Sequence, residues 1–222
     1  MLATICPVRF LEAFRLFKDA AKLAFGDGAT FVAAPEVRIL KVNGAKAKRI
    51  GKVDFILSRV DDAGNVTPDF AALEVQAVYF SGRELRSTVR RYLQTGELDQ
   101  TAMRRPDWRS SIQKRMMPQL ALKVPRIRNL HRKFFVATDS VLFGNIPQVR
   151  QVPSFENSEV TWLVYPFTNS GQKFVMGEPE IKFTEWEAVL TALREGEPLS
   201  RDEIVSEVAR KRRKFNLPTI RV

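Results

Sequence analysis

Three polar residues, Asp54, Glu74 and Gln76, interrupt stretches of sequence that otherwise predict buried strands. Asp54 lies within GKVDFILSRV, and the other two lie within AALEVQAVYF. Glu74 and Gln76 are two positions apart, so their side chains face the same side of a strand. Because a carboxylate that is buried without a partner costs several kcal/mol, a ligand or a countercharge should meet Glu74.

The pair of carboxylates indicates what that ligand is. Strands joined by a short loop are usually adjacent, which places Asp54 beside Glu74 at one edge of a sheet. Two carboxylates a few ångströms apart repel each other unless a cation lies between them. Carboxylate oxygens suit Mg²⁺, which can polarise a phosphate and activate a bound water. The alternative explanation for Glu74 is a salt bridge across the sheet to Arg59 or Lys52.

The elements that position these residues follow from hydrophobic periodicity and turn signals. In chain order the predicted elements are a helix at 7–25, strands at 36–42, 51–60 and 69–80, a helix at 82–96, a helical stretch at 107–130 interrupted by Pro118 and Pro125, and a strand at 133–138. Asn43-Gly44 predicts a turn after the first strand. The first three strands should form an antiparallel meander or a mixed sheet. Glu74 and Gln76 should then lie on the face opposite Leu73, which points into the core.

The C-terminal part adds a strand at 160–167 and two helices. Thr184 is predicted to cap the first helix, and Ser200 with Glu203 forms a capping box for the second. The fold class is therefore α/β. We expect a single domain over 1–222, with a core at about 7–145 and an extension of strand and helix at about 146–222.

The distribution of charge predicts a polyanionic partner. The net charge is +11, and nearly all of the excess lies between Arg83 and Lys133, where 14 lysine and arginine residues face four acids. Such a concentration favours a surface that binds phosphates over a solvated helical face. The DNA-binding candidates are Arg83, Arg86, Arg90, Arg91, Arg104, Arg105, Arg109, Lys114 and Arg115.

Composition excludes several other classes. The single cysteine, Cys6, excludes an internal disulfide framework, and the single histidine, His131, argues against a zinc site of cysteine and histidine. No apolar run approaches the roughly 18 residues of a membrane span, and the N-terminus lacks the features of a signal peptide. We therefore expect a cytoplasmic protein without a membrane partner.

The residues and the order of elements resemble the PD-(D/E)xK nuclease superfamily, and within it the NotI family of type II restriction endonucleases. The motifs that carry the resemblance are APEVRI at 34–39, GKVDFILSRV at 51–60, ALEVQAV at 72–78, and IQKRMMPQLALKVPRI with KFFVATDSVLF further on. The resemblance implies a restriction-endonuclease-like core of helix, three strands, helix and strand, with C-terminal helical additions.

The same resemblance assigns roles to individual residues. Asp54 and Glu74 would be the metal ligands, and Glu36 an additional acidic residue near the site. Gln76 would occupy the position usually held by a lysine that orients or activates the attacking water. Asp69, in the literal PD of TPDF, is too close to Glu74 to lie on a separate strand. The sequence departs from the family because one cysteine cannot build the cysteine-ligated iron domain of NotI.

We therefore expect a Mg²⁺-dependent type II restriction endonuclease that hydrolyses phosphodiester bonds in double-stranded DNA as a homodimer. One alternative is a repair or defence nuclease without a fixed recognition sequence. A second is a catalytically inactive DNA-binding relative, which Gln76 keeps open because an amide is neither a cation nor a general base. A third is a basic RNA- or ribosome-associated protein, which would not need the carboxylates.

Overall fold

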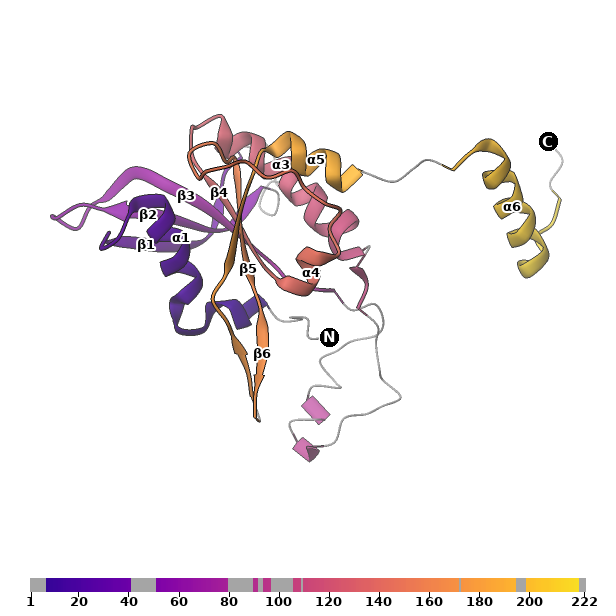
Figure 1. The fold of residues 1–222 in the computed structure, drawn as a ribbon, viewed down its shortest axis with the longest axis horizontal. Helices are drawn as coiled ribbons and strands as arrows, with labels where there is room; N and C mark the ends of the chain where they lie inside the picture. Colours follow the sequence, from indigo (N-terminus) through magenta and orange to yellow (C-terminus); the bar gives the residue numbers. More distant parts are fainter. Residues whose placement is uncertain are drawn as a thin grey trace, which may run out of the picture.

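A six-stranded mixed sheet forms the centre of the molecule, as the computed structural model of the chain shows (Figure 1). The structure describes residues 7–40, 51–79, 90–91, 94–96, 106–108, 110–171, 173–194 and 199–219. The strand order is β1-β2-β3-β4-β5-β8, and β6 and β7 form a separate two-stranded ribbon. The strands are β1 (Phe31–Arg38), β2 (Lys52–Val60), β3 (Val66–Gln76), β4 (Phe134–Asp139), β5 (Val160–Tyr165), β6 (Phe167–Ser170), β7 (Lys173–Met176) and β8 (Glu180–Thr184).

Strands β1, β2 and β3 pair antiparallel, whereas β4 and β5 join β3 in parallel, so the predicted α/β class with a mixed sheet is confirmed. The parallel step from β3 to β4 requires a crossover, which contains the π-helical η4 (Ser110–Met116) and the helix α3 (Met117–Arg128). The turn between β2 and β3 is held by Asp61, whose Oδ1 accepts from the backbone of Ala63 and Asn65.

Helices cover the sheet on both faces. The 3-10 segment η1 (Pro7–Phe14) and α1 (Arg15–Phe25) pack on one face through Phe10, Leu16 and Phe17. The opposite face is covered by η4, α3 and α5 (Trp186–Arg194), with the short α4 (Ser140–Gly144) beside them. The last helix, α6 (Arg201–Phe215), is described throughout and has no buried residue.

Glu74 and Gln76 lie on the face of β3 opposite Leu73, as expected, and both faces of the strand meet a hydrophobic core. Leu73 and Ala71 pack under α1, as expected, but Ala72 lies in the second core beneath α3. Strand β3 is therefore central and covered on both faces, as is usual where a helical crossover follows a strand. This places Glu74 in the interior of the molecule rather than on an open face.

Three predicted elements differ in detail. The helix at 7–25 is broken, because Ala13 and Phe14 adopt positive φ values of 53° and 56° between η1 and α1. The first strand begins earlier than predicted, and its turn at Asn43-Gly44 lies outside the described residues. Pro118 and Pro125 do not interrupt α3: the first lies in its opening turn, where a missing N–H costs little, and the second lies within the helix.

At the C-terminal end, the N-cap predicted at Thr184 is wrong and the capping box at Ser200 is confirmed. Thr184 ends β8, and its hydroxyl accepts from Trp162 Nε1 and donates to the carbonyl of Val160. Ser200 and Glu203 make both reciprocal contacts of a capping box.

The predicted division of the chain near residue 145 stays a prediction, although β5 and β8, which follow it, extend the same sheet. None of the helices among the described residues combines the length and the apolar character that crossing a membrane requires.

Candidate functional site

The strands β2 and β3 separate at the point where both carry a carboxylate. Their last paired residues at this end are Phe55 and Leu73, and Asp54 and Glu74 come one residue beyond. The backbone N–H of Asp54 donates to Glu74 Oε1 at 3.0 Å, and the N–H of Val75 donates to Asp54 Oδ2 at 2.9 Å. Each carboxylate thus replaces a carbonyl as acceptor for the opposite strand, and the predicted juxtaposition of Asp54 and Glu74 is present.

Glu74 is fully buried, and only one of its two carboxylate oxygens accepts hydrogen bonds from the described residues. Oε1 accepts two hydrogen bonds, whereas Oε2 is buried without a hydrogen-bond partner among the described residues. Burial, followed by the nearby charge of Asp54, raises the pKa of Glu74 to about 7. A buried oxygen of this kind is rare in folded proteins and marks a position that a ligand can complete.

The partner of Glu74 is a residue that the sequence analysis did not single out for this site. Lys123 Nζ donates to Glu74 Oε1 at 2.6 Å, and Lys123 is only 6% exposed. The predicted alternative, a salt bridge to Arg59 or Lys52, therefore names the wrong partner. The available signal was periodicity, because Lys123 lies three residues after Leu120 and four before Ile127, on the buried face of α3.

Gln76 also makes its contact with α3. Its Nε2 donates to Gln119 Oε1 at 2.9 Å, and Gln119 lies one helical turn before Lys123. Gln76 is only 7% exposed, whereas Gln119 is exposed at the rim of the site. The site is therefore built from β2, β3 and α3 together, not from two strands alone.

Glu36 lies on the edge strand β1, at the position opposite Asp54 of β2. It falls between the pairs Pro35–Phe55 and Val37–Val53 in the register of β1 and β2. Its φ is 52°, a left-handed conformation that is uncommon for glutamate and marks a local irregularity in the edge strand. Lys52 forms an ion pair with Glu36 and lowers its pKa.

A pocket of about 490 Å³, called the site pocket below, opens beside these residues. Its polar lining consists of Glu36, Asp54, Gln76, Arg115 and Gln119, and residues of η1, namely Pro7, Val8 and Leu11, contribute apolar lining. The Arg115 guanidinium lies 3.7 Å from the centre of the Tyr79 ring. The pocket lining thus combines acidic side chains from the sheet with a cation from η4.

The remaining basic candidates are placed only in part. Arg90 and Arg91 are helical and exposed, and Lys114 and Arg115 are exposed on η4. The other candidates, Arg83, Arg86, Arg104, Arg105 and Arg109, lie outside the described residues. Asp69 pairs with Arg132 at 2.9 Å and is not among the residues of the site pocket.

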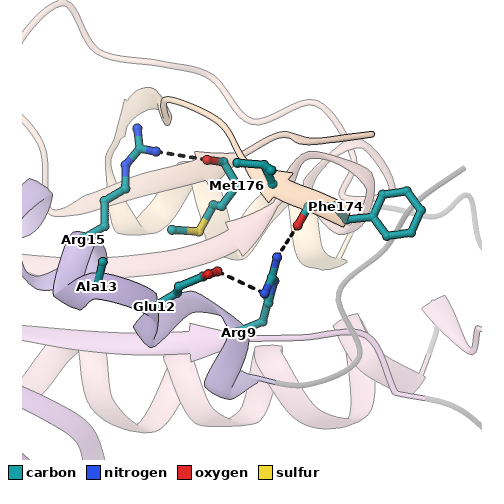
Figure 2. A pocket seen from close by; sticks show the side chains of 7 residues that line it. Arg9, Glu12, Ala13, Arg15, Phe174 and Met176 are labelled. Atoms are coloured by element: carbon teal, nitrogen blue, oxygen red, sulfur yellow. Dashed lines mark hydrogen bonds and ion pairs between the residues drawn. The ribbon is translucent and has the colours of Figure 1, made fainter. Parts of the chain in front are cut away.

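A second pocket, of about 670 Å³, is lined by other residues of η1 and is called the hairpin pocket (Figure 2). It is lined by Arg9, Glu12, Ala13 and Arg15 and by Phe174, Val175 and Met176 of β7. Arg15 Nη1 donates to the carbonyl of Met176 at 3.0 Å, and Arg9 pairs with Glu12 and with the carbonyl of Phe174 (Figure 2). Its arginines therefore hold the ribbon of β6 and β7 against η1.

The residues of the site fit a divalent cation. The donor set is two carboxylates, and Glu74 Oε2 is a buried oxygen without a partner among the described residues. Mg²⁺ is commonly held by one or two carboxylates, with water and phosphate oxygens completing the shell. No group of three or more histidine, cysteine, aspartate or glutamate side chains suited to a metal occurs in the described ranges, so a structural metal centre is not found there.

Comparison with protein families gives a match over most of the chain. The family model described as restriction endonuclease NotI matches residues 1–178, a span that includes both carboxylates, Gln76 and Lys123. No curated protein matches the chain. Because the family model covers well over half of the sequence, the chain belongs to the NotI restriction endonuclease family.

Proposed function

We propose that the protein is a Mg²⁺-dependent type II restriction endonuclease that hydrolyses phosphodiester bonds in double-stranded DNA at specific sequences. The observation that supports this proposal most is the end of the β2–β3 pairing at Asp54 and Glu74, where two carboxylates lie on neighbouring strands. One oxygen of this pair, Glu74 Oε2, is buried and has no hydrogen-bond partner among the described residues. The family match and this geometry support the same chemistry. The arrangement of elements also supports assignment to the PD-(D/E)xK superfamily.

In this proposal Asp54 and Glu74 hold the metal. When bound, Mg²⁺ polarises the scissile phosphate and lowers the pKa of the attacking water. Backbone donors fix one oxygen of each carboxylate, so the ligand positions are set before the metal arrives. Glu36 is an additional acid on the pocket wall.

Gln76 positions the water. Its Nε2 is committed to Gln119, which fixes the orientation of the amide. The amide oxygen is not used in that contact and can accept a hydrogen bond from the water. Because the amide neither carries charge nor accepts a proton near neutral pH, Gln76 orients the nucleophile and does not deprotonate it.

The basic residues that follow β3 bind the DNA backbone. Arg115 is the best placed of those described, because it lines the site pocket together with Asp54. Arg90, Arg91 and Lys114 extend the exposed positive surface, and arginine contacts to guanine edges supply part of the sequence preference. A homodimer cuts both strands, since a two-fold symmetric protein matches a two-fold symmetric DNA site.

The proposal is tested by incubating the protein with a plasmid of known sequence in Mg²⁺, in Mn²⁺ and in EDTA. The test set contains the wild type, Asp54→Ala and Glu74→Ala, with Asp69→Ala as a matched control on β3 whose carboxylate pairs with Arg132. Discrete fragments that need metal, Asp54 and Glu74, but not Asp69, are expected.

The other outcomes separate the alternatives. A continuous smear would indicate a nuclease without a fixed sequence, as in repair or defence. Tight binding without cutting in either metal would indicate an inactive DNA-binding relative, the alternative that Gln76 keeps open. Specific binding to RNA that survives Glu74→Ala would point to an RNA-associated protein.

A further inference from the structure

Two side-chain contacts connect β3 to α3 in register. Glu74 meets Lys123, and Gln76 meets Gln119. Residues two apart on a strand and four apart on a helix are each separated by about 6 to 7 Å along their axis, so the two pairs match in spacing. The face of β3 that carries the chemistry is therefore covered by one turn of α3, and that turn supplies a lysine.

The burial of Lys123 has no evident structural benefit. It shares the buried face of α3 with Leu120, Val124 and Ile127, where an apolar side chain would pack without the cost of removing an ammonium group from water. Replacing a buried ion pair by apolar residues of similar volume is often neutral or stabilising. A lysine at this position is better explained by its contact with the carboxylate of Glu74.

The effect on Glu74 is geometrical. Lys123 Nζ and the backbone N–H of Asp54 both donate to Oε1, at 2.6 and 3.0 Å. Two donors on one oxygen fix the carboxylate plane and leave Oε2 as the atom available to a ligand. At position 76 the strand offers only a neutral amide, which already donates to Gln119.

We propose that Lys123 is the positioning residue of this site: it supplies from α3 the positive charge that position 76 lacks, anchors Glu74 Oε1, and thereby presents Oε2 to the metal. This inference rests on the proposed metal-dependent nuclease function. A side chain of α3 thereby provides the positive charge beside Glu74 that no residue of the β3 motif provides.

The affinity for Mn²⁺ tests the inference, because two explanations for Lys123 predict changes in opposite directions when the lysine is replaced. If Lys123 only compensates charge, Lys123→Met removes a positive charge and strengthens the binding of Mn²⁺. If Lys123 anchors a ligand, its loss weakens Mn²⁺ binding by about 10-fold or more, as for other outer contacts to metal ligands. Mn²⁺ binding is measured by calorimetry on the full chain without DNA, so the readout does not depend on cleavage.

The control variants separate this inference from the proposed function. Lys18→Met removes one positive charge from an exposed position on α1 and should leave Mn²⁺ affinity unchanged. Asp54→Asn should abolish Mn²⁺ binding; if it does not, the metal is elsewhere and the proposed function fails. If Asp54→Asn abolishes binding but Lys123→Met binds Mn²⁺ equally or more tightly, only the role of Lys123 is overturned.

A charge relocation completes the experiment. The double variant Gln76→Lys with Lys123→Gln moves the ammonium from the helix to the strand, on the same face as Glu74. It should recover most of the Mn²⁺ affinity that Lys123→Gln alone loses, together with cleavage activity. Lys123→Gln also serves if Lys123→Met does not fold. A folded double variant that binds Mn²⁺ no better than Lys123→Gln would overturn the proposal.

Discussion

The site pocket and the hairpin pocket are lined by different residues of η1 and differ in how their charged residues are paired. In the hairpin pocket, which is the larger, Arg9 and Arg15 are paired with carboxylates and backbone carbonyls (Figure 2). At the site pocket, Asp54 is a lining residue, and its carboxylate and that of Glu74 each accept a hydrogen bond from the backbone of the neighbouring strand. Glu74 is buried beside this lining, and its Oε2 has no hydrogen-bond partner among the described residues. We place the candidate site at the smaller pocket because a buried carboxylate oxygen without a hydrogen-bond partner among the described residues lies beside it, whereas the arginines of the larger pocket face carboxylates.

The largest effect is expected from Asp54→Asn, which keeps the shape of the side chain but removes the charge that the metal requires. We expect cleavage to fall on the order of 1000-fold, equivalent to about 4 kcal/mol in transition-state stabilisation. Single-turnover cleavage of a plasmid measures the loss. The matched variant Asp69→Asn should retain activity, and an equal loss in both variants would contradict the assignment.

The next effect concerns pH. Because the pKa of Glu74 is raised to about 7 in the folded protein, its contribution to stability is fully present below the unfolded value of 4.5 and is lost as pH rises through about 7. The free energy of unfolding of the wild type should fall by about 3 kcal/mol relative to Glu74→Gln between about pH 4 and about pH 8.

Urea denaturation across that pH range measures the difference between wild type and Glu74→Gln. Repeating it in millimolar Mg²⁺ provides the control, because a bound cation favours the ionised carboxylate and should reduce the fall. Parallel pH curves for the two proteins in metal-free buffer would show that Glu74 ionises as it does in the unfolded chain.

A smaller effect is expected in the hairpin pocket. Arg15→Met removes the contact to Met176 and the pairing with Glu178, and should lower the free energy of unfolding by about 1 to 2 kcal/mol. The rate of cleavage at saturating DNA should not change, since Arg15 is not among the residues that line the site pocket. A stable Arg15→Met protein with impaired cleavage would break the distinction between the two pockets.

The smallest effect is expected from Arg115→Ala, at the rim of the site pocket. Loss of one phosphate contact should weaken DNA binding by about 1 kcal/mol and reduce the slope of log affinity against log salt by about 1. Binding is measured in Ca²⁺ at several salt concentrations. An unchanged salt slope would show that Arg115 does not contact the backbone.

The parts of the site that lie on strands were predictable, because strand alternation is local. The two-residue period places Glu74 and Gln76 on one face, and the short turn at Asp61 brings β2 beside β3. Lys123 was not predicted, because its basic neighbours indicated a phosphate-binding surface and its contact with Glu74 spans 49 residues. Such a contact depends on how α3 packs across β3, which no local pattern specifies.

The two wrong predictions of local structure, an unbroken helix at 7–25 and an N-cap at Thr184, also arose because local patterns do not specify tertiary packing. The apolar spacing of Phe10, Phe14 and Phe17 continues through the break between η1 and α1, so periodicity alone could not reveal it. Thr184 followed by Glu187 fits a capping pattern, but the hydroxyl is engaged in the core by Trp162. In both cases tertiary packing overrides a local preference.

The most direct test of the central claim is an anomalous difference map from crystals of the full chain soaked in Mn²⁺. We expect a single strong peak between the carboxylates of Asp54 and Glu74, with Glu74 Oε2 as a ligand and Lys123 still bound to Oε1. A map with Mn²⁺ bound elsewhere and no peak between these two carboxylates would contradict it.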